Sequence, residues 1–165
     1  MFPLTVKYRV TWVQAENAVY GARMSPDGRW VAYIVRKPDG GGDIWIRGVP
    51  PSTGEWRVGK GLYPAWRKDG RELFYLEPVS QRSGVNIHSR MVAVPFQSGS
   101  KPHIGPPKAL FGLKRFTGNT YDVAPDGQRF LISTSRNLDA LNNTAITIVQ
   151  NWPRLMKSQE PVAAP

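Results

Sequence analysis

Two histidines are the side chains of this 165-residue sequence best suited to general acid–base chemistry at neutral pH. His88 and His103 both lie in segments rich in Gly, Ser and Pro. A Ser–His–Asp triad would need a nucleophile elbow, but no Gly-x-Ser-x-Gly occurs, and Ser98-Gly99-Ser100 lacks a strand-to-helix setting. No Asp or Glu lies between the two histidines, so we reject a metal site there. We expect exposed loop histidines, no catalytic residues and no enzyme activity.

A glycine run between two aspartates, Asp39-Gly40-Gly41-Gly42-Asp43, could suggest a calcium or phosphate site. Calcium loops alternate several oxygen ligands and end in a bidentate acid, whereas phosphate loops lead into a helix. These glycines instead lead into the strand-like segment 43–49. The absence of cysteine also excludes disulfides, zinc–thiolate sites and iron–sulfur clusters. A mobile hairpin loop is the favoured interpretation, and we expect no metal and no cofactor.

Three segments share a turn in which Asp-Gly separates a short apolar stretch from a longer one. Proline in the second turn position presets φ, and glycine in the fourth can adopt a positive φ. We expect each aspartate to cap its own turn by bonding to the backbone, rather than to bind a ligand. The turn residues are Pro26, Asp27 and Gly28, then Asp69 and Gly70, then Pro125, Asp126 and Gly127.

Polar and apolar residues alternate with a period of two along the chain, and helical periodicity is almost absent. The clearest alternating run is 5–13, and a short helix is limited to 152–157. Further strand-like segments are 30–35, 43–49, 55–58, 73–76, 91–96, 129–133 and 145–150. Short, evenly spaced strands separated by turn residues predict an antiparallel all-β domain.

The spacing of the turns indicates the architecture. Asp27 and Asp69 are 42 residues apart, which matches the roughly 40–45 residues of a four-stranded propeller blade. Asp69 and Asp126 are 57 residues apart, and two polar loops, 78–89 and 98–107, account for the longer spacing. We predict a partial β-propeller of about three four-stranded antiparallel blades. The predicted units are one domain over 1–152, with repeats at 14–58, 59–115 and 116–152, an extra strand from a preceding blade within 1–13, and a flexible tail at 153–165.

The repeats resemble those of TolB-like propellers, which belong to the WD-repeat-like β-propeller group. Asp43-Ile44-Trp45-Ile46 resembles the third-strand signature, and Tyr63-Pro64-Ala65-Trp66 resembles the run-in to the turn. The final stretch, 121–132 and 146–152, resembles the C-terminal end of propellers that follow bacterial serine/threonine kinase domains or membrane anchors. The resemblance implies a non-enzymatic protein–protein interaction or scaffolding module.

The same resemblance implies a location outside the cytoplasm. The first residues lack the apolar block of a signal peptide, and no apolar run is long enough to span a membrane. A second function stays open, in which the propeller is an accessory region of a larger hydrolase or peptidase and gates or recruits its substrate.

A third function rests on charge. The chain carries 22 Lys and Arg against 12 Asp and Glu, a net charge of +10, and the surplus is largest in 59–115. A basic face could bind an anionic partner such as nucleic acid, but charges that alternate with apolar residues are typical of a solvated outer face. The basic residues of this segment include Lys60, Arg67, Lys68, Arg71, Arg82, Arg90, Lys101, Lys108, Lys114 and Arg115.

Closed propellers have four to eight blades, so three blades leave two open flanks, and unpaired edges tend to recruit partners. We therefore expect an open arc, a fragment of a larger ring, or self-association of two copies into a six-bladed ring. The tryptophans are expected to pack between neighbouring blades rather than to form a ligand cage. They are Trp12, Trp30, Trp45, Trp56, Trp66 and Trp152.

Overall fold

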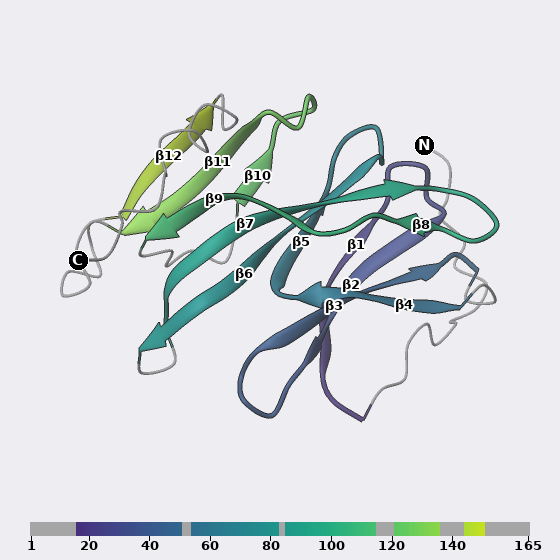
Figure 1. Cartoon of the computed structure of the whole chain (residues 1–165), viewed down its shortest axis with the longest axis horizontal. Helices are drawn as coiled ribbons and strands as arrows, with labels where there is room; N and C mark the ends of the chain where they lie inside the picture. The colour runs from purple at the N-terminus through teal and green to yellow at the C-terminus, as the bar shows by residue number, and fades with distance from the viewer. Residues whose placement is uncertain (1–15, 51–53, 83–84, 115–120, 136–143, 151–165) are drawn as a thin grey trace, which may run out of the picture.

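Three antiparallel sheets follow one another along the chain in the computed structural model (Figure 1). The structure describes residues 16–50, 54–82, 85–114, 121–135 and 144–150. The predicted strand at 5–13, the helix at 152–157, the tail, Trp12 and Trp152 lie outside these residues. Within them, no helix is long and apolar enough to cross a lipid bilayer. The described chain is all-β, as the alternation of polar and apolar residues predicted.

The first sheet is a four-stranded meander in sequence order. Its strands are β1 (Val19–Met24), β2 (Trp30–Arg36), β3 (Gly42–Gly48) and β4 (Glu55–Lys60). This sheet is the predicted first blade. Its second turn is the Asp-Gly hairpin between β2 and β3, which closes with a hydrogen bond from the Gly40 N–H to the Lys37 carbonyl at 3.1 Å.

The second sheet has five strands where four were predicted. They are β5 (Leu62–Trp66), β6 (Glu72–Arg82), β7 (Val85–Gln97), β8 (His103–Ile104) and β9 (Lys108–Lys114). The 13-residue β7 is long enough to pair with two partners on one edge. Phe96 lies opposite Ile104 of β8, and Met91 lies opposite Phe111 of β9. Two short strands therefore share the position of a fourth strand.

The prediction of a polar loop is wrong for most of 78–89, whereas 98–107 contains strand only at 103–104. β6 and β7 continue through the first as a hairpin in which Glu77 lies opposite Arg90, and β8 lies inside the second. The register of the hairpin shifts after Pro78, and such an irregularity tolerates a residue that cannot donate to the ladder. Composition alone did not indicate this hairpin, because it depends on the pairing of β6 with β7.

The third sheet contains β10 (Tyr121–Val123), β11 (Arg129–Ser135) and β12 (Thr144–Gln150). Among the described residues it has these three strands, and β12 forms its outer edge. The chain thus supplies about three blades in an open arrangement, as predicted. Outward-facing side chains of this sheet are exposed, with 44% of Leu131 and 61% of Ile148 accessible to solvent.

Apolar side chains fill both junctions between sheets, and β6 contributes to both. Leu73 and Tyr75 pack against the first sheet, whereas Phe74 and Leu76 pack against the third. A strand buried on both faces reads as a continuous apolar run, which explains the sequence of 73–76. Burial of each such side chain contributes about 1.5–3 kcal/mol, so these two junctions are the main stabilising feature of the fold.

The first strands of the sheets, β1, β5 and β10, are joined by aromatic side chains. The Trp66 Nε1–H donates to the Arg23 carbonyl at 2.9 Å, and the Tyr121 hydroxyl donates to the Tyr63 carbonyl at 2.8 Å. Burial raises the pKa of Tyr121, so its hydroxyl keeps its proton. Each blade is therefore tied to the next by a directional bond as well as by packing.

Candidate functional site

The repeat turns have the same internal geometry. Oδ1 of the aspartate accepts a hydrogen bond from the backbone N–H two residues later: 3.1 Å for Asp27, 3.0 Å for Asp69 and 2.9 Å for Asp126. The following glycines have φ values of 69°, 72° and 70°, in the left-handed region that favours glycine. These carboxylates therefore act first on their own turns, and each turn is a rigid hairpin end.

The first turn is also tied to the segment that follows β7. Asp27 Oδ2 accepts a hydrogen bond from the Ser98 hydroxyl at 3.1 Å, and Ser98 Oγ accepts one from the Trp30 indole N–H at 2.9 Å. The Ser25 hydroxyl also donates to Asp27. Burial alone would raise the pKa of Asp27, but the bonds from Ser25, the Arg29 N–H and Ser98 hold it below its usual value of 3.8. The carboxylate is charged and fixed in place.

A cleft of about 580 Å³ lies between the first two turns. This volume falls in the range of roughly 300–1,000 Å³ that is typical of binding pockets. Its floor is Phe96, which is only 4% exposed and packs edge-on against Trp30 and Trp66. Both the first and the second sheet contribute to its walls. The residues that matter most for its chemistry are Asp27, Asp69, Arg71, Phe96, Ser98 and His103.

One difference between the repeats explains why the cleft forms at the first junction. Arg67 occupies the repeat position of Ser25. Its side chain reaches the third turn: a methyl group added to Gly127 of that turn would lie only 3.0 Å from Arg67 Cδ. At the first junction a methyl group added to the corresponding glycine, Gly70, would have Pro26 Cδ as its nearest neighbour, at 3.7 Å. The long side chain fills the space between the second and third turns, and the short one leaves the cleft open.

The two histidines lie in different places, and neither is in a loop. His103 is in β8 and lines the cleft, whereas His88 is in β7 opposite Lys114. Both side chains are exposed. The predicted loop locations are wrong because His88 pairs with β6 and β9 as part of β7, and His103 pairs with the end of β7. Sequence reasoning missed Ser98 as a site residue, since nothing local indicates that it meets a turn 71 residues away, and it named Arg71 only as part of a basic segment.

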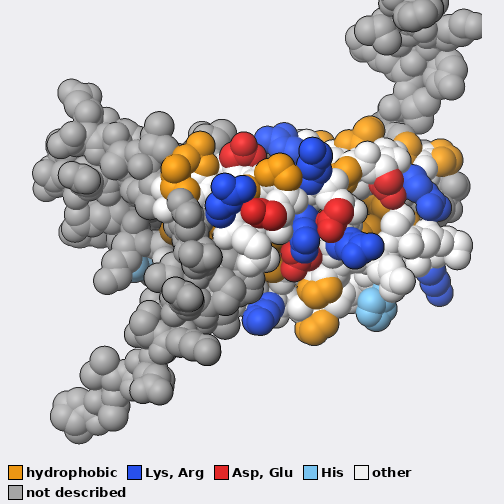
Figure 2. Space-filling model, turned by 90° about the horizontal axis from the view of Figure 1, so that it is seen from above, with side chains coloured by type: hydrophobic (Ala, Val, Ile, Leu, Met, Phe, Trp, Pro, Cys, Tyr) orange, Lys and Arg blue, Asp and Glu red, His pale blue; other side chains and the backbone are white. Residues whose placement is uncertain are grey.

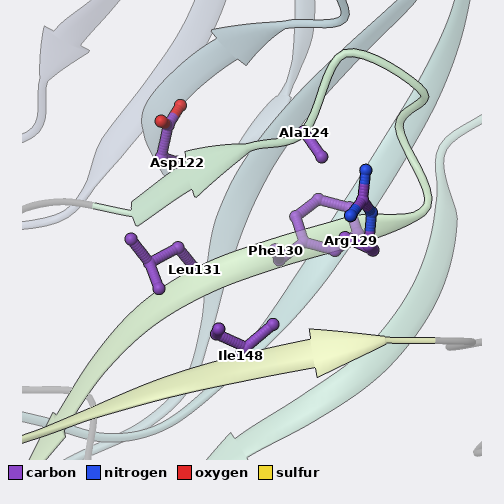
Figure 3. A pocket seen from close by; sticks show the side chains of 6 residues that line it. All are labelled: Asp122, Ala124, Arg129, Phe130, Leu131 and Ile148. Atoms are coloured by element: carbon purple, nitrogen blue, oxygen red, sulfur yellow. The ribbon is translucent and has the colours of Figure 1, made fainter.

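A second, shallower cavity of about 270 Å³ lies on the outer face of the third sheet (Figure 3). Leu131 and Ile148 stand on neighbouring strands there, with Asp122 on β10 and Arg129 on β11. Its volume is below the usual range for a ligand pocket. It is better described as the exposed face of an edge blade.

Positive charge is interspersed with negative charge on the face seen in Figure 2. Arg67 contacts Asp69 at 3.4 Å and Glu72 at 3.0 Å, and Arg90 pairs with Glu77. Two basic residues of the middle segment, Arg67 and Arg90, are thus paired with close carboxylates. Arg115 and the side chains of Arg82 and Lys114 lie outside the described set.

The glycine run forms a hairpin whose acids are engaged. Asp39 Oδ1 accepts a hydrogen bond from the Gly41 N–H at 2.8 Å, and Asp43 Oδ1 lies 3.0 Å from Arg57 and 3.4 Å from Lys37. Across the described part of the chain, no three His, Asp or Glu side chains gather closely enough to hold a metal ion. The run therefore forms a turn with ion-paired flanks.

Three of the tryptophans pack at the first junction. The rings of Trp30 and Trp56 meet edge to face at 5.7 Å, and Trp66 meets Phe96 at 4.9 Å. Trp45 is half-buried, and it pairs with Tyr33 in the ladder between β2 and β3. Packing between blades is thus the role of Trp30 and Trp66, and Trp56 packs on Trp30 within the first sheet.

No protein-family model and no curated protein sequence matches this chain. Among solved structures, the β-propeller domain of the Trilobed protease from Pyrococcus furiosus, described as having an open velcro topology, superposes with a TM-score of 0.57 at 16% identity. The match covers 86% of this chain and 40% of that one. The chain therefore has the fold of part of a β-propeller.

Two further similarities are weaker. TolB from Acinetobacter baumannii gives a TM-score of 0.38 at 14% identity, over 84% of this chain and 42% of that one. An acylaminoacyl peptidase, solved in complex with Z-Gly-Gly-Phe-chloromethyl ketone, gives 0.34 at 14% identity, over 80% of this chain and 31% of that one. This chain spans less than half the length of all three proteins.

Proposed function

We propose that this chain is a non-enzymatic protein-interaction or scaffolding module of the TolB-like propeller type. The observation that carries the proposal is the cleft between the first two turns, which is open to solvent while its walls are held by their own hydrogen bonds. Binding sites are commonly carried on loops that a rigid scaffold positions, and preorganised walls reduce the entropy lost on binding. The cleft is the proposed contact surface.

Selection of random displayed peptides on the immobilised protein tests this proposal. We expect saturable binders whose affinity falls in Gln97→Trp, because Gln97 lines the cleft and is exposed, so that the indole fills it. Gln128→Trp places the same bulk on the exposed third turn and is the matched control. Failure to select any binder, or equal loss in both variants, would contradict the assignment of the cleft.

A second candidate is an accessory propeller of a larger hydrolase or peptidase. Its support is the fold shared with the propeller domain of the Trilobed protease. The coding sequence next to this chain distinguishes the two: a kinase domain, a membrane anchor or envelope genes favour the interaction module. A peptidase domain in the same reading frame favours the accessory role.

Self-association is our proposal for one kind of partner. Leu131 takes the repeat position of Ala32 and Phe74, both of which are buried against the next sheet, yet 44% of Leu131 is exposed. A further blade from a second copy would cover it. Light scattering on the purified chain should then give about 37 kDa, twice the 18.5 kDa of one chain, and a monomer would contradict self-association.

Binding of an anionic polymer such as nucleic acid is the least supported alternative, because basic and acidic side chains are interspersed and Arg67 and Arg90 are paired with carboxylates. It predicts affinity that falls steeply with salt. Absence of retention on heparin or DNA at low salt would exclude it.

A further inference from the structure

The hydrogen-bonding groups of the cleft are unequally satisfied. Asp27 already accepts bonds from Ser25, Ser98 and the Arg29 N–H, and Asp69 accepts the Arg71 N–H and lies 3.4 Å from the Arg67 guanidinium. Donors of the protein itself therefore occupy part of the acceptor capacity of both carboxylates. Asp69 also lies close to a cation, whereas the donors to Asp27 are two hydroxyls and a backbone N–H, so Asp27 keeps its negative charge in the cleft.

The two basic side chains of the cleft have no such partners. Arg71 and His103 are exposed, and among the described residues neither the guanidinium nor the imidazole forms a hydrogen bond or ion pair. A guanidinium offers five N–H donors in a planar fork that matches a carboxylate, and imidazole adds another donor. The capacity left in the cleft is thus mainly that of donors, which calls for an acceptor anion.

The walls restrict which anion fits. A phosphodiester backbone offers only acceptor oxygens and negative charge. Phosphates bound to Arg71 and His103 would therefore lie across the cleft from Asp27 and Asp69, which would repel them. A peptide carries a carboxylate for Arg71 and His103 and also backbone N–H groups that the aspartate oxygens can accept. The volume of about 580 Å³ has room for more than one side chain over the rigid Phe96 floor.

We propose that the cleft binds a peptide segment of a partner protein through an acidic side chain, whose carboxylate bonds to Arg71 and His103. This inference rests on the proposed interaction function and adds the chemistry of the partner. The strong hydrogen bond is the charge-assisted pair between guanidinium and carboxylate, and the imidazole fixes the second oxygen.

The displayed-peptide selection separates this inference from the function on which it rests. We expect the wild-type chain to enrich Asp- and Glu-containing peptides, Arg71→Gln to lose that enrichment, and Lys60→Gln to keep it. Lys60 is an exposed cation at the C-terminal end of β4, where it lies opposite Asp43, at the end of the first sheet remote from the Asp27 turn. Lys60→Gln therefore removes the same charge away from the cleft. Binders that lack acids, or that ignore Arg71→Gln, would overturn this inference alone. Absence of any binder would overturn both proposals.

A titration with a defined probe gives the magnitude. The fluorescein-labelled peptide Gly-Gly-Glu-Glu-Gly-Gly, here the acidic hexapeptide, is followed by anisotropy against the whole chain. Loss of one charge-assisted bond should weaken binding about tenfold in Arg71→Gln, and several-fold in His103→Gln, with Lys60→Gln within about twofold of wild type. Unchanged melting temperatures show that the variants fold.

Two controls complete the titration. The matching peptide with Gln in place of Glu should bind far more weakly, and free glutamate at equal concentration should not displace the probe. Equal binding of the Gln peptide, or equal loss of affinity in Lys60→Gln and Arg71→Gln, would overturn the inference. Full displacement by free glutamate would show that the cleft takes small carboxylates instead of a peptide segment.

Discussion

The two junctions between blades are built on the same repeat yet differ at the end that carries the turns. The second is filled by Phe74, Phe111 and Phe130, with ring centroids 5.1–5.4 Å apart, and by the Arg67 side chain between its turns. The first has an equally apolar interior but ends in the bonds of Asp27 to Ser98 and in the open cleft. One junction is closed by packing at both ends, and the other carries the cleft that we propose as a contact surface.

The difference arises from one side chain of each repeat. The Ser25 hydroxyl bonds back to its own turn and accepts a hydrogen bond from the backbone N–H of Trp30 at 3.0 Å. Arg67 instead extends to the next turn and to Glu72. A repeat that closes into a packed fold can therefore gain a cleft by exchanging a long side chain for a short one. The backbone geometry of the turns does not change.

The largest expected effect tests the packed junction. Phe130 is fully buried, and its replacement in Phe130→Ala removes ring contacts with Phe74 and Phe111 and leaves a cavity. We expect a loss of about 3–5 kcal/mol in the free energy of unfolding, measured by urea denaturation. Leu131→Ala, one residue along and 44% exposed, should cost far less. Equal losses would show that the second junction does not stabilise the chain.

A smaller effect is expected at the polar end of the first junction. Trp30→Phe keeps an aromatic ring but removes the N–H that bonds to Ser98. The loss should be about 1–2 kcal/mol, with faster amide hydrogen exchange in the segment after β7. Trp45→Phe, at a half-buried position of the same sheet, is the control and should leave that exchange unchanged. Unaltered exchange in Trp30→Phe would contradict the role of this bond.

The charge of Asp27 predicts a pH dependence. Its folded pKa is held below 3.8, so the carboxylate contributes stability above the unfolded value, and this contribution is lost as the pH falls through the folded pKa. In Asp27→Asn, the urea midpoint of unfolding should depend less on pH between pH 5 and the acid range than it does in the wild type. Ser98→Ala removes one donor and should move the acid loss to higher pH. Parallel curves for all three proteins would contradict the network.

The smallest expected effect on stability comes from a variant that should open the second junction in the way the first is open. Arg67→Ser takes away a half-exposed ion pair and should cost only about 0–1 kcal/mol, while opening space between the second and third turns. A crystal structure of this variant should contain a second cleft beside Gly127. A closed junction in that structure would show that Arg67 is not what fills it.

Much of the fold could be predicted from local residues. The Asp-Gly turns and their 42-residue spacing indicate the blades, because a hairpin needs glycine where φ is positive. The hairpin over 78–89 could not be predicted from its composition, since it depends on the pairing of β6 with β7. The cleft was missed because it depends on which of two polar side chains, Ser25 or Arg67, reaches a turn in the next blade.

The most direct test of the central claim follows the backbone amide and arginine Nε–H NMR signals of the whole chain while the acidic hexapeptide is added. The account predicts the largest shifts at Arg71 and along 97–103, with saturation at one peptide per chain. Shifts centred on Lys60 or on β12, or an Arg71 signal that does not move, would contradict the claim that the first junction is the binding surface.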